Sequence, residues 1–193
     1  MTRKPRADSL RNRERLLAAA KTAFGAHGAE APLEDIARRA GLGIGTLYRH
    51  FPTRAAMVAA VYERETAQLA DSADHLLATL QPDQALEAWL HLLVDYLATK
   101  RMLAPALTTA GEGVRIHSPA TATLGGVLDR LIETARADGG IQPEIETADV
   151  GRLLAGLSQG TERQGWEDSA RRLVGVIMSG IRRRAPASAL PQD

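Results

Sequence analysis

The sequence predicts an all-α protein, with a small three-helix unit at the N-terminus followed by a larger helical unit. Apolar residues recur at three- and four-residue steps through most of the chain, which is the period of an amphipathic helix. Glycine and proline fall between these periodic segments, where helices tend to end. The composition supports a packed core, because hydrophobic residues make up 45% of the 193 residues.

The composition also excludes several classes of protein. The chain contains no cysteine, which removes disulfides, thiolate metal sites and cysteine nucleophiles and fits a reducing cytoplasm. The basic residues at the N-terminus lead into further charged residues without an apolar segment, so no secretory signal is expected. Apolar runs such as residues 173–178 are far too short to span a bilayer. We therefore expect a cytoplasmic protein without a membrane partner.

Charge is divided unevenly along the chain. Residues 1–54 hold 11 Lys and Arg against 5 Asp and Glu, a formal charge of +6, whereas the remainder holds 13 against 18, or −5. Because counterion release rewards local positive charge, the N-terminal part is the one suited to a polyanion. A solvated charged surface without any partner would also produce such a division.

Two helices are predicted before residue 41. The first spans about residues 9–26 and has an apolar stripe formed by Leu16, Leu17, Ala20, Ala23 and Phe24. The second has Pro32 in its first turn, where proline is tolerated, and an apolar side formed by Leu33, Ile36, Ala37 and Ala40. Gly41 is positioned to end this second helix.

A third helix follows the glycine-rich turn that begins at Gly41. At about 100° per residue, Leu47 and Phe51 point together into the small core. Gly45 and Arg49 then centre on the opposite side. A glycine in that position would let the helix approach another molecule closely.

The outward residues of this third helix suit a nucleic acid. Arg49 can bond a guanine edge, and Thr46 can offer a hydroxyl or a methyl group to a base. Tyr48 and His50 can bond phosphate oxygens and fix the register. Ile44 is ambiguous, because its phase leans toward the core although its place in the first turn could expose it to a thymine methyl group.

Arg54 opens a predicted fourth helix, whose apolar residues are Met57, Val58, Val61 and Tyr62. Its guanidinium and the amides at the start of the helix could bind a phosphate together. Taken singly, Arg49, His50 and Arg54 could also belong to an ordinary solvated surface. Their combination beside a short glycine turn favours DNA binding.

The stretch from Leu33 to Arg54 resembles the helix-turn-helix signature of TetR-type transcriptional repressors. The Ile-Ala, Ala-Gly, Gly-Thr-Leu-Tyr and His-Phe elements keep their relative spacing, and the resemblance covers about residues 9–65. It implies a three-helix DNA-binding domain and a longer helical domain that dimerises and binds a small effector. It also implies that the operator is released when that effector binds. No cofactor or metal is expected.

Carried over by position, the resemblance implies a set of DNA contacts. Base contacts would come from Gly45, Thr46 and Arg49, with an apolar contact from Ile44. Phosphate contacts would come from Tyr48, His50 and Arg54. A basic arm containing Arg3, Lys4 and Arg6 could reach the minor groove.

The chain departs from the family pattern at three places. Gly43 stands where a serine or threonine usually begins the recognition helix, although glycine can still serve as an N-cap. The pair Ala31-Pro32 lacks the hydroxyl that is common at the start of the second helix. Ile44 replaces a common lysine, so any contact that it makes with DNA must be apolar.

The rest of the chain predicts further helices near residues 54–80, 84–101, 119–138, 146–161 and 166–184. We expect a DNA-binding domain at residues 1–53, an effector-binding and dimerisation domain at 54–185, and a disordered tail at 186–193.

The last two predicted helices have broad apolar stripes and several glycines. Such stripes are usually core, yet two adjacent helices of this kind can pair around a two-fold axis. The resemblance favours such a homodimer. Its predicted interface residues are Leu153, Leu157, Ala170, Leu173, Val174, Ile177 and Ile181.

A pocket for an unidentified small-molecule effector is expected among the middle helices. Its polar and aromatic candidates are Trp89, Tyr96, Glu112 and His117. Trp89 and Tyr96 belong to residue types that more often anchor a core than contact a ligand.

Three patterns that could indicate an enzyme lack the context that they need. Residues 156–160 match G-x-S-x-G, but they follow a helix-periodic segment instead of a strand. Residues 41–45 lack the strand and the lysine of a phosphate-binding loop. His91 and Asp95 share a helical side without a third metal ligand nearby. We therefore expect no catalytic residue.

The residues and the resemblance together predict a homodimeric repressor that an effector releases from a near-palindromic DNA operator. Two alternatives remain open. One is an activator or global regulator without a metabolite ligand. The other is an effector-responsive protein-interaction module whose DNA contacts have degenerated.

Overall fold

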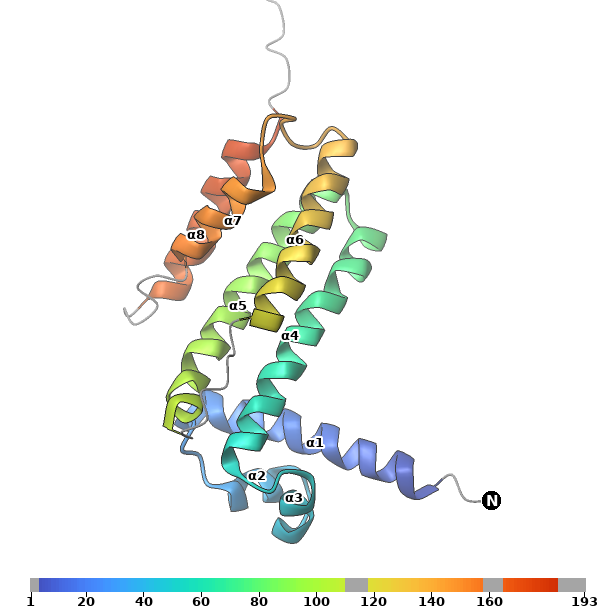
Figure 1. The fold of residues 1–193 in the computed structure, drawn as a ribbon, viewed down its shortest axis with the longest axis vertical. Coiled ribbons are helices and arrows are strands. Elements are labelled where there is room, and N and C mark those ends of the chain that lie inside the picture. The colour runs from blue at the N-terminus through green and yellow to red at the C-terminus, as the bar shows by residue number, and fades with distance from the viewer. Residues whose placement is uncertain (1–3, 110–117, 158–164, 184–193) are drawn as a thin grey trace, which may run out of the picture. The chain divides into compact units, whose positions relative to one another are not determined.

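The computed structural model describes residues 4–109, 118–157 and 165–183. Its regular elements in these ranges are helices, which confirms the predicted all-α fold. None of these helices combines the length and the apolar character needed to cross a membrane. In chain order (Figure 1), the helices are α1 (Lys4–His27), α2 (Leu33–Arg39), α3 (Ile44–His50), α4 (Arg54–Thr79), α5 (Pro82–Thr109), α6 (Ser118–Ala137), α7 (Thr147–Leu157) and α8 (Trp166–Ile181).

The helices form two compact units. The first contains the described residues up to Gln68 and those from Tyr96 to Ala120, and the second contains the others. Helices α4 and α5 therefore each contribute to both units. The domain boundary predicted after residue 53 falls at the start of α4, inside the first unit, and stays a prediction. The tail predicted at residues 186–193 lies outside the described residues.

Helices α1, α2 and α3 supply much of the core of the first unit, with α2 packed against both of the others. The residues predicted for the apolar sides of α1 and α2 are buried. Helix α1 begins at Lys4, earlier than predicted, and Pro5 stands in its first turn, where proline is compatible with a helix. Pro32 is the N-cap of α2 and precedes its first helical residue, Leu33.

The turn between α2 and α3 needs a glycine. Gly41 has a φ of +64°, a conformation that other residues rarely adopt. A Cβ atom at this position would also lie 2.6 Å from Nη2 of Arg15. Gly41 therefore permits both the change of direction before α3 and the close approach of an arginine from α1.

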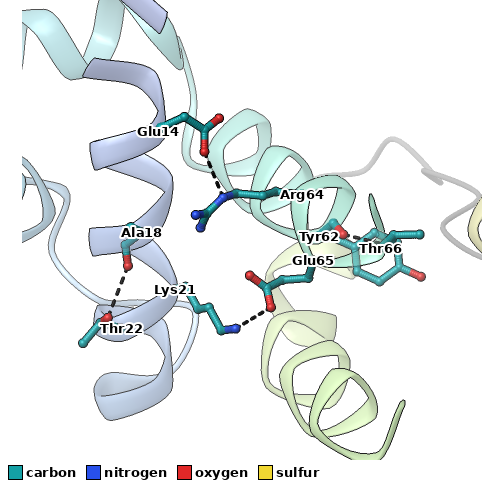
Figure 2. A network of polar contacts seen from close by, with 8 residues as sticks. All are labelled: Glu14, Ala18, Lys21, Thr22, Tyr62, Arg64, Glu65 and Thr66. Carbon is teal, nitrogen blue, oxygen red and sulfur yellow. Dashed lines mark hydrogen bonds and ion pairs between the residues drawn. The ribbon is translucent and has the colours of Figure 1, made fainter. Parts of the chain in front are cut away.

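Two ion pairs connect α1 to α4 (Figure 2). Lys21 of α1 pairs with Glu65, whose side chain is only 8% exposed. Nearer the start of α1, Glu14 pairs with Nε of Arg64 at 3.0 Å, and this second pair is more exposed to solvent. The pairs fix α4 against α1 at two separate points.

Indole groups and one arginine stabilise the second unit. Trp89 Nε1 donates to the carbonyl of Leu69 at 2.9 Å, and Trp166 Nε1 donates to that of Leu157 at 2.7 Å. Arg182 follows α8 and forms ion pairs of 2.8 and 2.7 Å with two carboxylates of α5, those of Asp83 and Glu87. The end of α8 is thereby attached to the start of α5.

The predicted end of α5 differs most from the structure. Helix α5 runs to Thr109 instead of ending near residue 101. The described part of α7 ends at Leu157, and the remaining predicted residues up to 161 lie outside the described ranges.

Candidate nucleic-acid interface

Helix α3 is held by its two large apolar residues. Leu47 and Phe51 are both buried, as the phase of the helix predicted. Gly43 is the N-cap, with extended backbone angles and no side-chain hydrogen bond to the first turn. A short helix of seven residues is therefore fixed by core packing and not by capping.

The opposite side of α3 faces solvent. Gly45 and Arg49 are exposed, Tyr48 is 46% exposed, and Thr46 and His50 are partly exposed. The ambiguity at Ile44 is resolved in favour of the surface, since its side chain is 36% exposed. Small, apolar, aromatic and cationic groups thus share one accessible surface, which can contact base edges and phosphates.

Arg49 lies along its own helix. Its Nε donates to the carbonyl of Gly45, and its Nη2 donates to Oγ1 of Thr46, both at 3.2 Å. The guanidinium is therefore held by polar groups of its own helix. Gly45 itself has an ordinary helical φ, and a Cβ added to it would meet no atom within 4 Å. The packing of the protein alone does not require a glycine at position 45.

Arg54 has a structural role that the sequence did not predict. Its Nη1 donates to the carbonyls of Ala29 at 2.8 Å and Ala31 at 2.6 Å, so it fixes the loop between α1 and α2. The start of α4 is also capped, because Oγ1 of Thr53 accepts from the amide of Ala56 at 3.0 Å. The phosphate contact of Arg54 stays a prediction. It would use the guanidinium nitrogens other than Nη1, which is bonded to the loop.

Arg13 is a further residue that sequence reasoning missed. Its guanidinium carbon lies 5.1 Å from the centre of the Phe51 ring, within the range of a cation–π contact. The spacing contained an indication of this, because Arg13 precedes the buried Leu16 and Leu17 by three and four residues and so continues their side of α1. Arg13 therefore connects α1 to the end of α3.

The predicted N-terminal arm is only partly described. Lys4 is the first residue of α1, and Arg6 lies within its first turn, so this segment is helical instead of extended. Arg3 lies outside the described residues.

Two family models match the chain. A model described as bacterial regulatory proteins of the tetR family matches residues 16–61. A model described as the C-terminal domain of SbtR-like transcriptional regulators matches residues 81–183. The chain belongs to the TetR family. It is accordingly a DNA-binding transcriptional regulator and not an enzyme.

Solved structures of TetR regulators resemble the chain along most of its length. A TetR transcriptional regulator from Streptomyces coelicolor is 38% identical, with 90% of this chain and 99% of that chain covered and a TM-score of 0.78. A TetR regulatory protein from Mycobacterium vanbaalenii is 35% identical, with coverages of 92% and 98% and a TM-score of 0.76. A comparison with curated proteins gives no match.

Two of the residues predicted for the effector pocket of this TetR regulator lie in the described part of the chain, and both are buried. Trp89 is buried in the second unit, bonded to Leu69. Tyr96 is buried in the first unit, where its hydroxyl lies 3.2 Å from Oγ1 of Thr66 and its ring centre 5.8 Å from that of Tyr62. Burial and the hydrogen bond to Tyr96 raise the pKa of Tyr62. Both aromatic candidates therefore have contacts in the core, and the other two, Glu112 and His117, lie outside the described residues, so the pocket stays a prediction.

The predicted dimer residues of the TetR regulator divide into two sets. Five of them are buried inside the second unit, where α7 packs against α8: Leu157, Ala170, Val174, Ile177 and Ile181. These five side chains are covered within one chain, and their contact with a second copy stays a prediction. Leu153 and Leu173 are 53% and 44% exposed, and the sequence reasoning missed Val176, which is 63% exposed. The apolar stripes of α7 and α8 are wide, so each includes residues from the buried side and from the exposed side of its helix.

Two of the patterns that could indicate an enzyme involve residues of the described helices. Asp95 forms an ion pair with Arg171 of α8, so its carboxylate is engaged away from a metal site with His91. The G-x-S-x-G match begins at Gly156 inside α7, and its Ser158 lies outside the described residues.

Proposed function

We propose that this regulator is a homodimeric repressor that reads a near-palindromic operator through α3 and leaves it when a small-molecule effector binds. The observation that carries the proposal is the outer side of α3, where Gly45, Tyr48 and Arg49 are exposed while Leu47 and Phe51 hold the helix from within. In the major groove, Gly45, Thr46 and Arg49 would face the bases and Ile44 would contact a thymine methyl group.

Phosphate contacts would fix the register of α3 in the groove. Tyr48 and His50 lie beside the base-facing residues on the same helix. Arg54 and the N-terminal residues Arg3, Lys4 and Arg6 would add cationic contacts at either side. These contacts contribute affinity and salt dependence without contributing sequence preference.

Two copies of the chain would present two α3 helices to successive major grooves. The exposed apolar residues of α7 and α8, namely Leu153, Leu173 and Val176, are suited to contact a second copy, because leucine and valine gain free energy when they leave water. A symmetric dimer with α3 helices about 34–36 Å apart reads half-sites one helical turn apart.

Release by an effector would follow from differential affinity. An effector that binds better to a dimer with wrongly spaced α3 helices shifts the population toward that state. Helices α4 and α5 support this coupling, because each has residues in both compact units.

The experiment begins with genomic DNA fragments selected by the purified protein, which yield an operator sequence. The free energy of DNA binding discriminates between the operator and operators with one base pair changed. We expect Arg49→Ala to reduce this discrimination at one base pair by about 1–3 kcal/mol. Tyr48→Phe, which removes only a hydroxyl, should weaken binding to all sequences equally. Fluorescence anisotropy measures both effects. If both variants retained the affinity and sequence preference of the parent protein, α3 would not be the reading element.

A further inference from the structure

An open hollow of about 500 Å³ lies on the first unit, between α1 and the end of α2. Most of the side chains around it are small, and two are arginines: it is lined by Arg15, Ala18, Ala19, Thr22, Arg39 and Ala40. Thr22 donates its hydroxyl proton to the carbonyl of Ala18 at 3.2 Å. The two exposed guanidiniums are therefore the available hydrogen-bond donors of the hollow.

These two arginines differ from three paired arginines in the same unit. Arg11, Arg38 and Arg64 each pair with a carboxylate, those of Asp8, Asp35 and Glu14 respectively. By contrast, neither Arg15 nor Arg39 forms an ion pair with any residue that the structure describes. Two uncompensated guanidiniums beside one hollow favour an anion, and their planar donor geometry matches phosphate oxygens.

The position of Arg15 connects the hollow to the recognition helix. Its guanidinium lies against Gly41, where a Cβ would come within 2.6 Å of Nη2. Gly41 lies three residues before Ile44, the first residue of α3. Because the major groove is about 8.5 Å deep, the turn that leads into an inserted helix lies near the level of the phosphates at the edge of the groove.

We infer that Arg15 and Arg39 together bind backbone phosphate of the DNA beside the groove that α3 enters. This inference rests on the proposed insertion of α3 into the major groove. The contact is independent of sequence, and it extends the DNA-binding surface from α3 to the middle of α1 and the end of α2.

The test measures the salt dependence of binding to a duplex of mixed sequence, so it does not require the operator. Arg15→Gln and Arg39→Gln should each weaken binding at low salt and lower the slope of log K against log salt by about one for each bound protomer. Arg38→Gln is the matched control. It removes the same charge from the residue next to Arg39, but Arg38 is already paired with Asp35. The salt dependence of DNA binding by the Arg38→Gln protein should have the same slope as that of the parent protein.

Two additional variants keep the test decisive. Arg15→Lys retains a cation and should restore most of the slope. If Arg15→Gln unfolds, because the side chain also contacts the turn at Gly41, Arg39→Gln carries the test alone. Thermal unfolding of each variant separates folding from binding.

Three results would overturn the inference. One is a parent-like slope in both Arg15→Gln and Arg39→Gln. Another is a loss in those variants no larger than in Arg38→Gln. The third is a rise in the thermal midpoint with inorganic phosphate that depends on both arginines, combined with unchanged DNA slopes, since the hollow would then bind a free anion. In all three cases Tyr48→Phe and Arg49→Ala would still test the proposed function, because their effects do not depend on the hollow.

Discussion

Gly45 is the residue at which stability and the proposed contact with DNA make opposite demands. A glycine inside a helix costs about 1 kcal/mol relative to alanine, because it gives up more backbone freedom on folding. Nothing in the part of the chain that the structure describes compensates for this cost, since the backbone at Gly45 is ordinary and no described atom lies within 4 Å of an added Cβ. The missing side chain is best explained by a partner that approaches α3 closely.

We therefore expect Gly45→Ala to raise the free energy of unfolding by up to about 1 kcal/mol while it weakens DNA binding. The methyl group would stand between the helix and the base edges, although it would meet no atom of the free protein within 4 Å. Chemical denaturation and anisotropy titrations measure the two effects on the same sample.

Gly126→Ala is the matched control for this substitution. Gly126 is an exposed residue inside α6, and a Cβ there would also meet no atom within 4 Å. It should stabilise the protein in the same way without changing DNA affinity. A Gly45→Ala protein that bound DNA as tightly as its parent would remove the argument for close approach.

The two ion pairs between α1 and α4 join the same helices but differ in the burial of their carboxylates (Figure 2). Glu65 is almost fully buried, and its Oε1 has no hydrogen-bond partner in the structure, so Lys21 provides the charge compensation that the structure records for this carboxylate. Glu14 is 58% exposed in its pair with Arg64, so water competes for its carboxylate. The same two helices thus contain one pair with a buried carboxylate and one with an exposed carboxylate.

We expect Lys21→Met to lower the free energy of unfolding by about 1–3 kcal/mol, because it leaves a buried carboxylate without its cation. The double variant Lys21→Met with Glu65→Met should regain much of that loss, since no buried charge remains. Glu14→Gln should change stability by less than about 1 kcal/mol. Urea denaturation distinguishes these cases, and equal losses for Lys21→Met and Glu14→Gln would contradict the assignment of burial as the cause.

The sequence predicted those features of the helices that depend on interactions between residues close together in the chain. The sides of α1, α2 and α3 could be read from the sequence, because helical phase depends only on nearby residues. The contact of Arg54 with the loop carbonyls of Ala29 and Ala31 could not, since it joins residues more than twenty positions apart. The exposed side of α7 and α8 could not be read from the sequence for another reason. Their apolar stripes are wide, and phase alone does not distinguish the side that packs within the chain from the side left exposed.

That distinction determines how the assembly of two chains should be tested. Ile177 is buried against the rest of its unit, so a glutamate there would place a charge in the core and unfold the protein. Leu173 and Val176 are exposed on the same helix. We expect the pair Leu173→Glu and Val176→Glu to give a folded monomer, with helical circular dichroism retained and the molar mass by light scattering halved. A folded double variant that stays dimeric would place the interface on another surface.

The same double variant tests whether dimerisation sets the geometry of DNA recognition. In a dimer, the two α3 helices are held at one separation, so an operator with half a helical turn of DNA inserted between its half-sites would present the second half-site on the opposite side of the duplex. The parent protein should lose most of its affinity for the lengthened operator. The monomeric variant should bind both operators equally, and more weakly than the parent binds its natural spacing, because each α3 then binds its half-site independently. Equal sensitivity of the parent and the monomer to the insertion would mean that one chain reads the whole site, and the two-fold arrangement proposed for this regulator would have to be abandoned.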